Sequence, residues 1–90
     1  MIYYAECFAK PYGGGWAVAD TPEAALKQAR RNVAETAKHE RGSYVLEFPD
    51  NADVSCGNEL YGGWRANVHP TRIVSKHKIT MADNALLGRE

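Results

Sequence analysis

The chain has no excess charge of either sign, no long apolar run and no catalytic signature. Its 90 residues include 11 basic and 11 acidic side chains, so no net field attracts nucleic acid or an anionic membrane. No stretch approaches the ~20 apolar residues of a membrane span. The first residues also lack the basic and apolar regions of a signal peptide. These absences favour a cytoplasmic protein.

Cysteine is scarce, and the two thiols lie far apart in the sequence, at Cys7 and Cys56. Structural zinc sites use short paired spacings such as C-x-x-C, and none occurs here, so we expect no metal. Without an export signal both thiols should be reduced and structural, although a disulfide between them stays open. Cys56 lies beside a turn and is the better candidate for a thiol nucleophile, yet no supporting motif surrounds it. We therefore expect no catalytic residue and no cofactor.

Two short segments concentrate glycine and tryptophan. The first glycine–aromatic segment is Tyr-Gly-Gly-Gly-Trp at 12–16, and the second is Tyr-Gly-Gly-Trp at 61–64. Glycine permits tight reversals, and the aromatic rings supply large contact areas with a polar tip. Each segment could close the end of a sheet or present a recognition surface. We predict that Trp16 lies in the core and that Trp64, beside Arg65, lies on the surface.

The apolar pattern predicts one α+β domain spanning residues 1–90, with a single antiparallel sheet of about four to six strands and one long helix on one face. Strands are expected over residues 2–10, 16–19, 43–48, 52–56, 64–68 and 72–80. In the first strand, alternation places small residues (Ala5, Cys7, Ala9) together on one face. That small face suits a closely packed helix.

The long helix is expected at about residues 22–41. Thr21 can cap it, Pro22 suits the first helical position, and Gly42 is a natural stop. Its apolar stripe comprises Leu26, Ala29, Val33 and Ala37. Residues 81–87 fit a short terminal helix, capped by Thr80 and stopped by Gly88.

Charge is balanced in total but uneven along the chain. Residues 47–59 contain four acids and no base, whereas residues 65–78 contain four bases and no acid. The two blocks could pair across adjacent strands or form separate patches. In the strand over 72–80, alternation places Arg72, Val74, Lys76 and Lys78 on one face and Ile73, Ser75, His77 and Ile79 on the other. The helix carries a second basic stripe of Lys27, Arg31, Lys38 and Arg41, which is either a solvated face or a docking face for a polyanion.

Two resemblances bear on function. The stretch D-T-P-E-A-A-L-K-Q-A-R at 20–30, after a glycine-aromatic strand, resembles the start of the helix in HicB-type antitoxins. The whole plan is similar to compact α+β proteins of phages and other mobile elements, including several anti-CRISPR proteins. The second resemblance implies a non-enzymatic protein in the host cytoplasm that covers a functional surface of a host complex. Neither resemblance assigns a role to a residue.

The sequence thus predicts a non-enzymatic interaction protein, most concretely a phage or mobile-element inhibitor that sterically blocks a bacterial nucleic-acid-targeting complex. The alternative is a direct nucleic-acid-binding domain that uses the basic strand and the aromatic–glycine loops. The oligomeric state stays open. The predicted partner-binding residues are Tyr61, Trp64, Arg65, Arg72, Lys76 and Lys78, with Tyr12, Lys27, Arg31 and Lys38 as secondary candidates.

Overall fold

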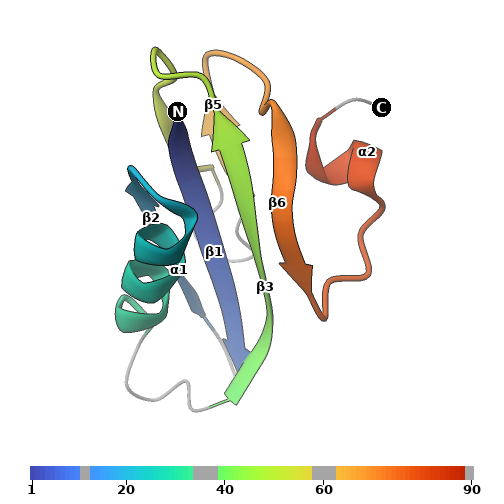
Figure 1. Cartoon of the computed structure of the whole chain (residues 1–90). Coiled ribbons are helices and arrows are strands. Elements are labelled where there is room, and N and C mark those ends of the chain that lie inside the picture. Colours follow the sequence, from blue (N-terminus) through green and yellow to red (C-terminus); the bar gives the residue numbers. More distant parts are fainter. Residues whose placement is uncertain (11–12, 34–38, 58–62, 89–90) are drawn as a thin grey trace.

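The computed structural model describes residues 1–10, 13–33, 39–57 and 63–88, which form six strands and two helices (Figure 1). The strands are β1 (Ile2–Lys10), β2 (Gly14–Ala19), β3 (His39–Phe48), β4 (Val54–Cys56), β5 (Trp64–Ala66) and β6 (Arg72–His77). The helices are α1 (Pro22–Arg31) and α2 (Asp83–Leu86). Neither helix is long and apolar enough to cross a membrane.

The strands form two sheets rather than the single sheet expected from the sequence. The main sheet is antiparallel, with the strand order β2-β1-β3-β6, and β4 pairs with β5 in a separate two-stranded sheet. The α+β class and the antiparallel sheet are therefore confirmed. The expectation of one sheet is wrong because β4 and β5, at three residues each, pair with each other and form a second layer.

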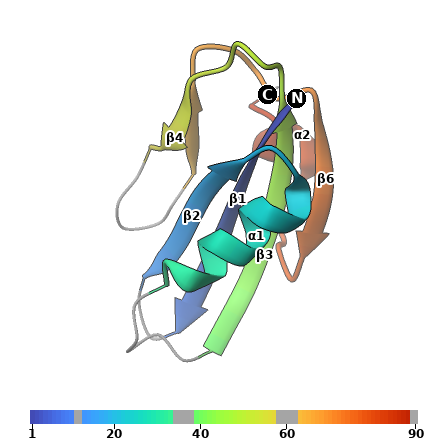
Figure 2. The same cartoon turned by 60° about the vertical axis from the view of Figure 1, so that its left-hand side comes forward.

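The main sheet has a different covering on each face. Figure 1 shows α1 in front of the sheet and β5 behind it, and Figure 2 separates the same layers from the side of β2. The α1 side buries the small residues Ala5, Cys7, Ala17, Ala25, Ala29 and Val45. The opposite side buries the large residues Tyr4, Tyr44, Leu46, Phe48, Leu86 and Leu87. The predicted alternation of β1 is confirmed, because Ala5 and Cys7 face α1 and Tyr4 faces away.

α1 begins where the sequence predicts and ends about ten residues early. Thr21 is the N-cap, and its Oγ1 accepts a hydrogen bond from the Ala24 N–H at 3.2 Å. The last helical residue is Arg31, and Arg41, expected in the helix, lies instead in β3. The cause is pairing with β1, because residues 39–42 lie opposite Phe8–Lys10 and extend the ladder along the whole of that strand. Tertiary pairing thus overrides helix propensity here.

Close packing of α1 on the sheet depends on Gly15. A Cβ atom there would overlap the Ala29 carbonyl oxygen and lie 2.8 Å from the Val33 nitrogen. At the end of α1, the Asn32 side chain donates from Nδ2 to the Trp16 carbonyl oxygen at 2.9 Å. The first glycine–aromatic segment therefore contains the residues on which the end of α1 packs.

A bulge in β6 changes which residues share a face. Leu46 lies opposite Ile73 and Val45 lies opposite Ser75, so one extra residue is inserted. Tyr44 is opposite Lys76, which places Lys76 on the face opposite α1, whereas Arg72 pairs with Glu47 on the α1 side. The predicted strict alternation is therefore wrong after the bulge, and Arg72 and Lys76 lie on opposite faces of the sheet.

α2 confirms the short terminal helix but is shorter than predicted. It covers Asp83–Leu86, its N-cap is Ala82 rather than Thr80, and no side chain caps it. Gly88 follows with φ of +72°, the left-handed conformation expected of a stop. The buried Leu86 and the adjoining Leu87 join the large-residue cluster, so α2 covers part of the sheet face opposite α1.

Candidate functional site

A cavity of about 700 Å³ opens on the face of the sheet opposite α1. Its wall comes from β1, β3, the start of β5 and the segment from Lys78 to Gly88. The volume lies within the range typical of ligand-binding pockets. Among the described residues its lining holds three aromatic rings (Phe8, Tyr44, Trp64), two cations (Arg41, Lys78) and no acidic side chain.

The aromatic side chains of the cavity are held by packing and hydrogen bonds. The rings of Phe8 and Tyr44 have centroids 6.1 Å apart. The Trp64 indole donates from Nε1 to the Leu86 carbonyl oxygen at 2.7 Å and meets the Phe48 ring edge-on at 5.6 Å. The Trp64–Leu86 hydrogen bond thereby joins β5 to α2 on one side of the cavity, and the Phe8–Tyr44 contact joins β1 to β3 on the other.

The predicted placement of Trp16 in the core is wrong, and that of Trp64 on the surface holds only in part. Trp16 is 39% exposed and stacks on Tyr4 with ring centroids 5.9 Å apart, because it lies on the edge strand β2. Trp64 is half-buried and packs against the large-residue cluster. Its partner in α2 is more than twenty residues away along the chain, so no local signal marks it as part of the core.

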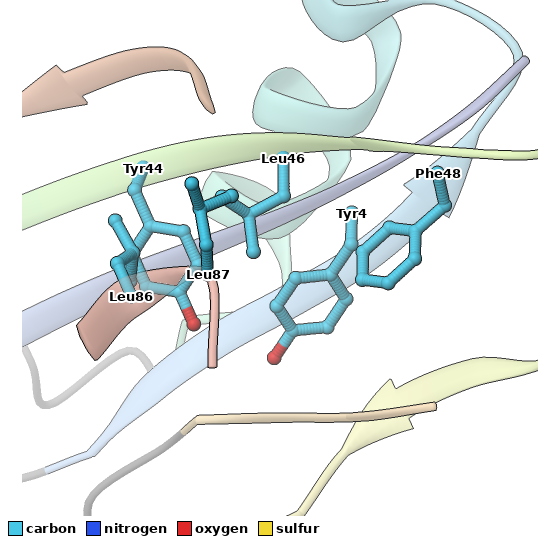
Figure 3. Packing of buried hydrophobic residues seen from close by; sticks show 6 residues of the cluster. All are labelled: Tyr4, Tyr44, Leu46, Phe48, Leu86 and Leu87. Atoms are coloured by element: carbon cyan, nitrogen blue, oxygen red, sulfur yellow. The ribbon is translucent and has the colours of Figure 1, made fainter. Parts of the chain in front are cut away.

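Sequence reasoning missed Glu6, a buried carboxylate behind the cavity wall. Glu6 Oε1 accepts hydrogen bonds from the Tyr4 hydroxyl at 2.7 Å, the Tyr44 hydroxyl at 2.6 Å and the Gly63 N–H at 2.9 Å. Figure 3 shows both tyrosines reaching to the same side of the sheet, Tyr44 beside Leu86 and Leu87 and Tyr4 beside Phe48. The Cys56 sulfur also lies 4.0 Å from Glu6 Oε2. A signal existed, because Glu6 interrupts an otherwise apolar face of β1.

The Glu6 cluster keeps its tyrosines protonated. Burial raises the pKa of Tyr4 and of Tyr44 well above the usual range, and the adjacent carboxylate adds to the effect in both. Both hydroxyls therefore act as donors to Glu6. The third donor, the Gly63 N–H, belongs to the second glycine–aromatic segment, so the cluster fixes the start of β5 against the main sheet.

The two cations of the cavity lie at irregular points of the backbone. Arg41 falls at the bulge in β3, where the register with β1 shifts after Phe8. Lys78 has φ of +56°, a conformation that residues other than glycine seldom adopt. The neighbouring chain is close, because a Cβ on Gly42 would lie 3.0 Å from the Lys78 carbonyl oxygen. Within the described part of the chain neither cation forms an ion pair.

The structure brings Trp64 and Lys78 to the cavity and disperses the other described candidates. Arg72 pairs with Glu47 at 3.2 Å, and Lys76 pairs with Asp83 at 2.7 Å. Glu47–Arg72 is one ion pair between the acidic and basic blocks across adjacent strands, whereas Lys76 pairs outside the acidic block. Arg65 is exposed on β5, with Nη2 3.5 Å from the Gly57 carbonyl oxygen.

Arg41 does not belong to the basic stripe predicted on the helix. Lys27 and Arg31 are exposed on α1, but Arg41 belongs to β3 and lines the cavity instead. The predicted residues Tyr12, Lys38 and Tyr61 lie outside the described residues.

The cysteines belong to different layers and are not joined by a disulfide. Cys7 is buried beneath α1, and Cys56 is half-buried in β4. Burial raises the pKa of the Cys7 thiol to about 11, which makes it a poor nucleophile at neutral pH.

Comparisons with protein-family models, with curated proteins and with solved structures give no match for this chain.

Proposed function

We propose that this chain is a non-enzymatic interaction protein that recognises its partner through the cavity opposite α1. The partner is a protein that inserts an apolar side chain next to a carboxylate. The observation that carries the proposal is the lining, which combines aromatic rings with Arg41 and Lys78 and has no acidic side chain among the described residues.

The chemistry of this lining matches that of a recognition site. Phe8, Tyr44 and Trp64 offer apolar surface to an inserted side chain, and burial of such surface drives association. Tryptophan, tyrosine and arginine are the residue types enriched at interface hot spots. The two cations add attraction to an acidic partner and select its orientation.

In its most concrete form, the protein is a phage or mobile-element inhibitor that sterically blocks a bacterial nucleic-acid-targeting complex. The resemblance to anti-CRISPR proteins supports this form. The cationic lining of the cavity fits an acidic surface on a protein component of such a complex. It does not imitate nucleic acid, which is an anion.

Direct binding of nucleic acid is the alternative, and the arrangement of cations supports it less. Arg72 and Lys76 lie on opposite faces of the sheet, and each is engaged by a carboxylate. The basic strand expected from the sequence would need Arg72 and Lys76 together on one surface to follow a single strand.

A charge reversal at the cavity tests the proposal. The tagged chain and the variant Lys78→Glu would be used to capture proteins from a bacterial lysate, and the recovered partner would then be purified and titrated. We expect Lys78→Glu to weaken its binding at least tenfold, because the new carboxylate repels the acidic group of the partner. The matched control is Lys27→Glu on α1, an exposed lysine remote from the cavity lining. Equal binding by wild type and Lys78→Glu, or loss of binding in the control alone, would contradict the proposal.

A further inference from the structure

The two edges of the main sheet are protected to different degrees. β6 carries Arg72, Lys76 and His77 and a bulge, which are the devices that keep edge strands from pairing with other chains. β2, the opposite edge, is Gly14–Ala19 and contains no charged residue, no proline and no bulge in its register with β1. An uncharged, regular edge strand is an exposed template for strand addition.

The backbone of β2 offers hydrogen-bonding groups on its outer side. The Gly13 carbonyl accepts a hydrogen bond from the Ala9 N–H at 3.1 Å, so Gly13 and Ala9 form a hydrogen-bonded pair of the antiparallel ladder. Because such pairs alternate in an antiparallel ladder, Gly14, Trp16 and Val18 direct their N–H and C=O groups away from β1. The Asn32 amide, which reaches the Trp16 carbonyl from outside, agrees with this direction. That carbonyl retains a second lone pair.

The side chains of the same residues are apolar and exposed. Trp16 is 39% exposed and Val18 is 40% exposed, and both lie on the face opposite α1 because they alternate with the buried Ala17. In Figure 2, which looks toward this margin, β2 runs between the layer of α1 and the layer of β4 and β5. The exposed apolar side chains and the outward backbone groups therefore share one edge, at which Asn32 bonds the Trp16 carbonyl.

We propose that β2 pairs antiparallel with β2 of a second copy of this chain, so that two four-stranded sheets join into one continuous sheet. The pairing is isologous, with a two-fold axis perpendicular to the sheet, and both α1 helices lie on the same face. A second copy suits this edge because a strand without charge meets itself without like-charge repulsion. In the register centred on Ala17, Trp16 faces the partner's Val18, an aromatic–aliphatic cross-strand pair of the kind that stabilises sheets.

This inference is independent of the proposed function. The cavity is lined by residues of β1, β3, the start of β5 and the C-terminal segment, and none of β2 takes part. A chain that dimerises through β2 would leave the cavity open.

The oligomeric state in solution tests the inference. Sedimentation equilibrium over a wide range of concentration should show a species of twice the 10.0 kDa chain mass, dissociating on dilution. Val18→Lys places a charge on the edge, and Val18→Pro removes an outward N–H that β1 does not use. Both variants should be monomeric at concentrations where the wild type is a dimer. Ser75→Lys, an exposed site on β6, is the matched control and should remain dimeric.

Hydrogen exchange on the wild type tests the pairing without a substitution that could unfold the chain. The Trp16 and Val18 amides should become protected as concentration rises, whereas the inward Ala17 amide should be protected throughout. A wild type that is monomeric at every concentration would overturn the inference. So would a dimer that survives both Val18 variants. Loss of a partner protein on Val18→Lys in a monomeric chain would assign the edge to a foreign strand instead.

Discussion

Glu6 shows how one residue joins two layers of this molecule. It extends from β1 on the face opposite α1, where the other side chains are apolar, and it accepts bonds from two tyrosines and from the backbone of Gly63. Alternation in β1 could place Glu6 on that face from the sequence. Its partners could not be predicted, because Tyr44 and Gly63 reach it only through the order of the strands and the fold of the second sheet.

Replacement of the Glu6 carboxyl group should destabilise the fold. In Glu6→Gln an NH₂ donor replaces one oxygen. If it takes the place of Oε2, it lies 3.2 Å from the Gly63 nitrogen, donor against donor, and if it takes the place of Oε1, both tyrosine hydroxyls lose their acceptor. We expect the free energy of unfolding to fall by about 1–3 kcal/mol. Urea denaturation followed by circular dichroism measures this change. The matched control is Glu40→Gln, which removes an exposed pair with Arg30 and should cost at most about 1 kcal/mol. A larger loss in the control would count against a structural role for Glu6.

Alkaline pH should also destabilise the fold. The pKa of Cys7 is raised from 9.0 to about 11 by burial, and the pKa values of Tyr4 and Tyr44 are raised from 10.0 in the same direction. The unfolded chain therefore loses these protons at lower pH than the folded chain. Stability is fully present below pH 9.0 and falls as the pH rises toward 11. The urea midpoint, measured across this interval, should decrease, and Cys7→Ser should lessen the slope. A midpoint that rises with pH would refute the assignment.

At the scale of elements, a local signal predicted the start of α1 but not its end. The start of α1 is encoded locally by Thr21, Pro22 and Glu23, and the structure has that start. Its end at Arg31 is decided by β1, which pairs with residues 39–42. The bulge in β6 is equally hidden from the sequence, because it depends on the register with β3. Long-range pairing sets those boundaries, and a single sequence does not display it.

The Thr21 cap at the start of α1 should contribute measurably to the free energy of unfolding. Thr21→Ala removes the hydroxyl that accepts from the Ala24 N–H, and we expect a loss of about 0.5–2 kcal/mol in the free energy of unfolding. Thermal or urea denaturation measures it. Thr21→Ser keeps the acceptor and should recover most of the loss. An unchanged stability in Thr21→Ala would mean that packing on the sheet alone holds the first turn.

At the scale of the whole molecule, the balance of charge limits the kinds of partner. The chain carries 11 basic and 11 acidic residues, and Glu47 of the acidic block pairs with Arg72 of the basic block across β3 and β6. The sequence showed the balance of charge and left open whether the two blocks pair or form separate patches. The cavity lay beyond prediction, since Arg41 was assigned to the helix and Lys78 to a regular strand.

The equal number of basic and acidic residues predicts weak binding to nucleic acid. Titration with single-stranded and double-stranded oligonucleotides at two salt concentrations should show low affinity and a shallow dependence on salt, because few cations are available to displace counterions. Fluorescence anisotropy of a labelled oligonucleotide is a suitable measurement. Tight binding that weakens steeply with salt would favour the direct nucleic-acid-binding alternative.

The chain has two tryptophans, and each adjoins a different proposed surface. Trp64 lines the cavity and Trp16 lies on the β2 edge, so the protein contains two separate optical reporters. In Trp16→Phe the remaining indole should change its emission when the cavity is occupied. In Trp64→Phe the remaining indole should respond to dilution as the edges separate. Fluorescence of two single-substitution variants can thus follow the two surfaces independently, without an added label.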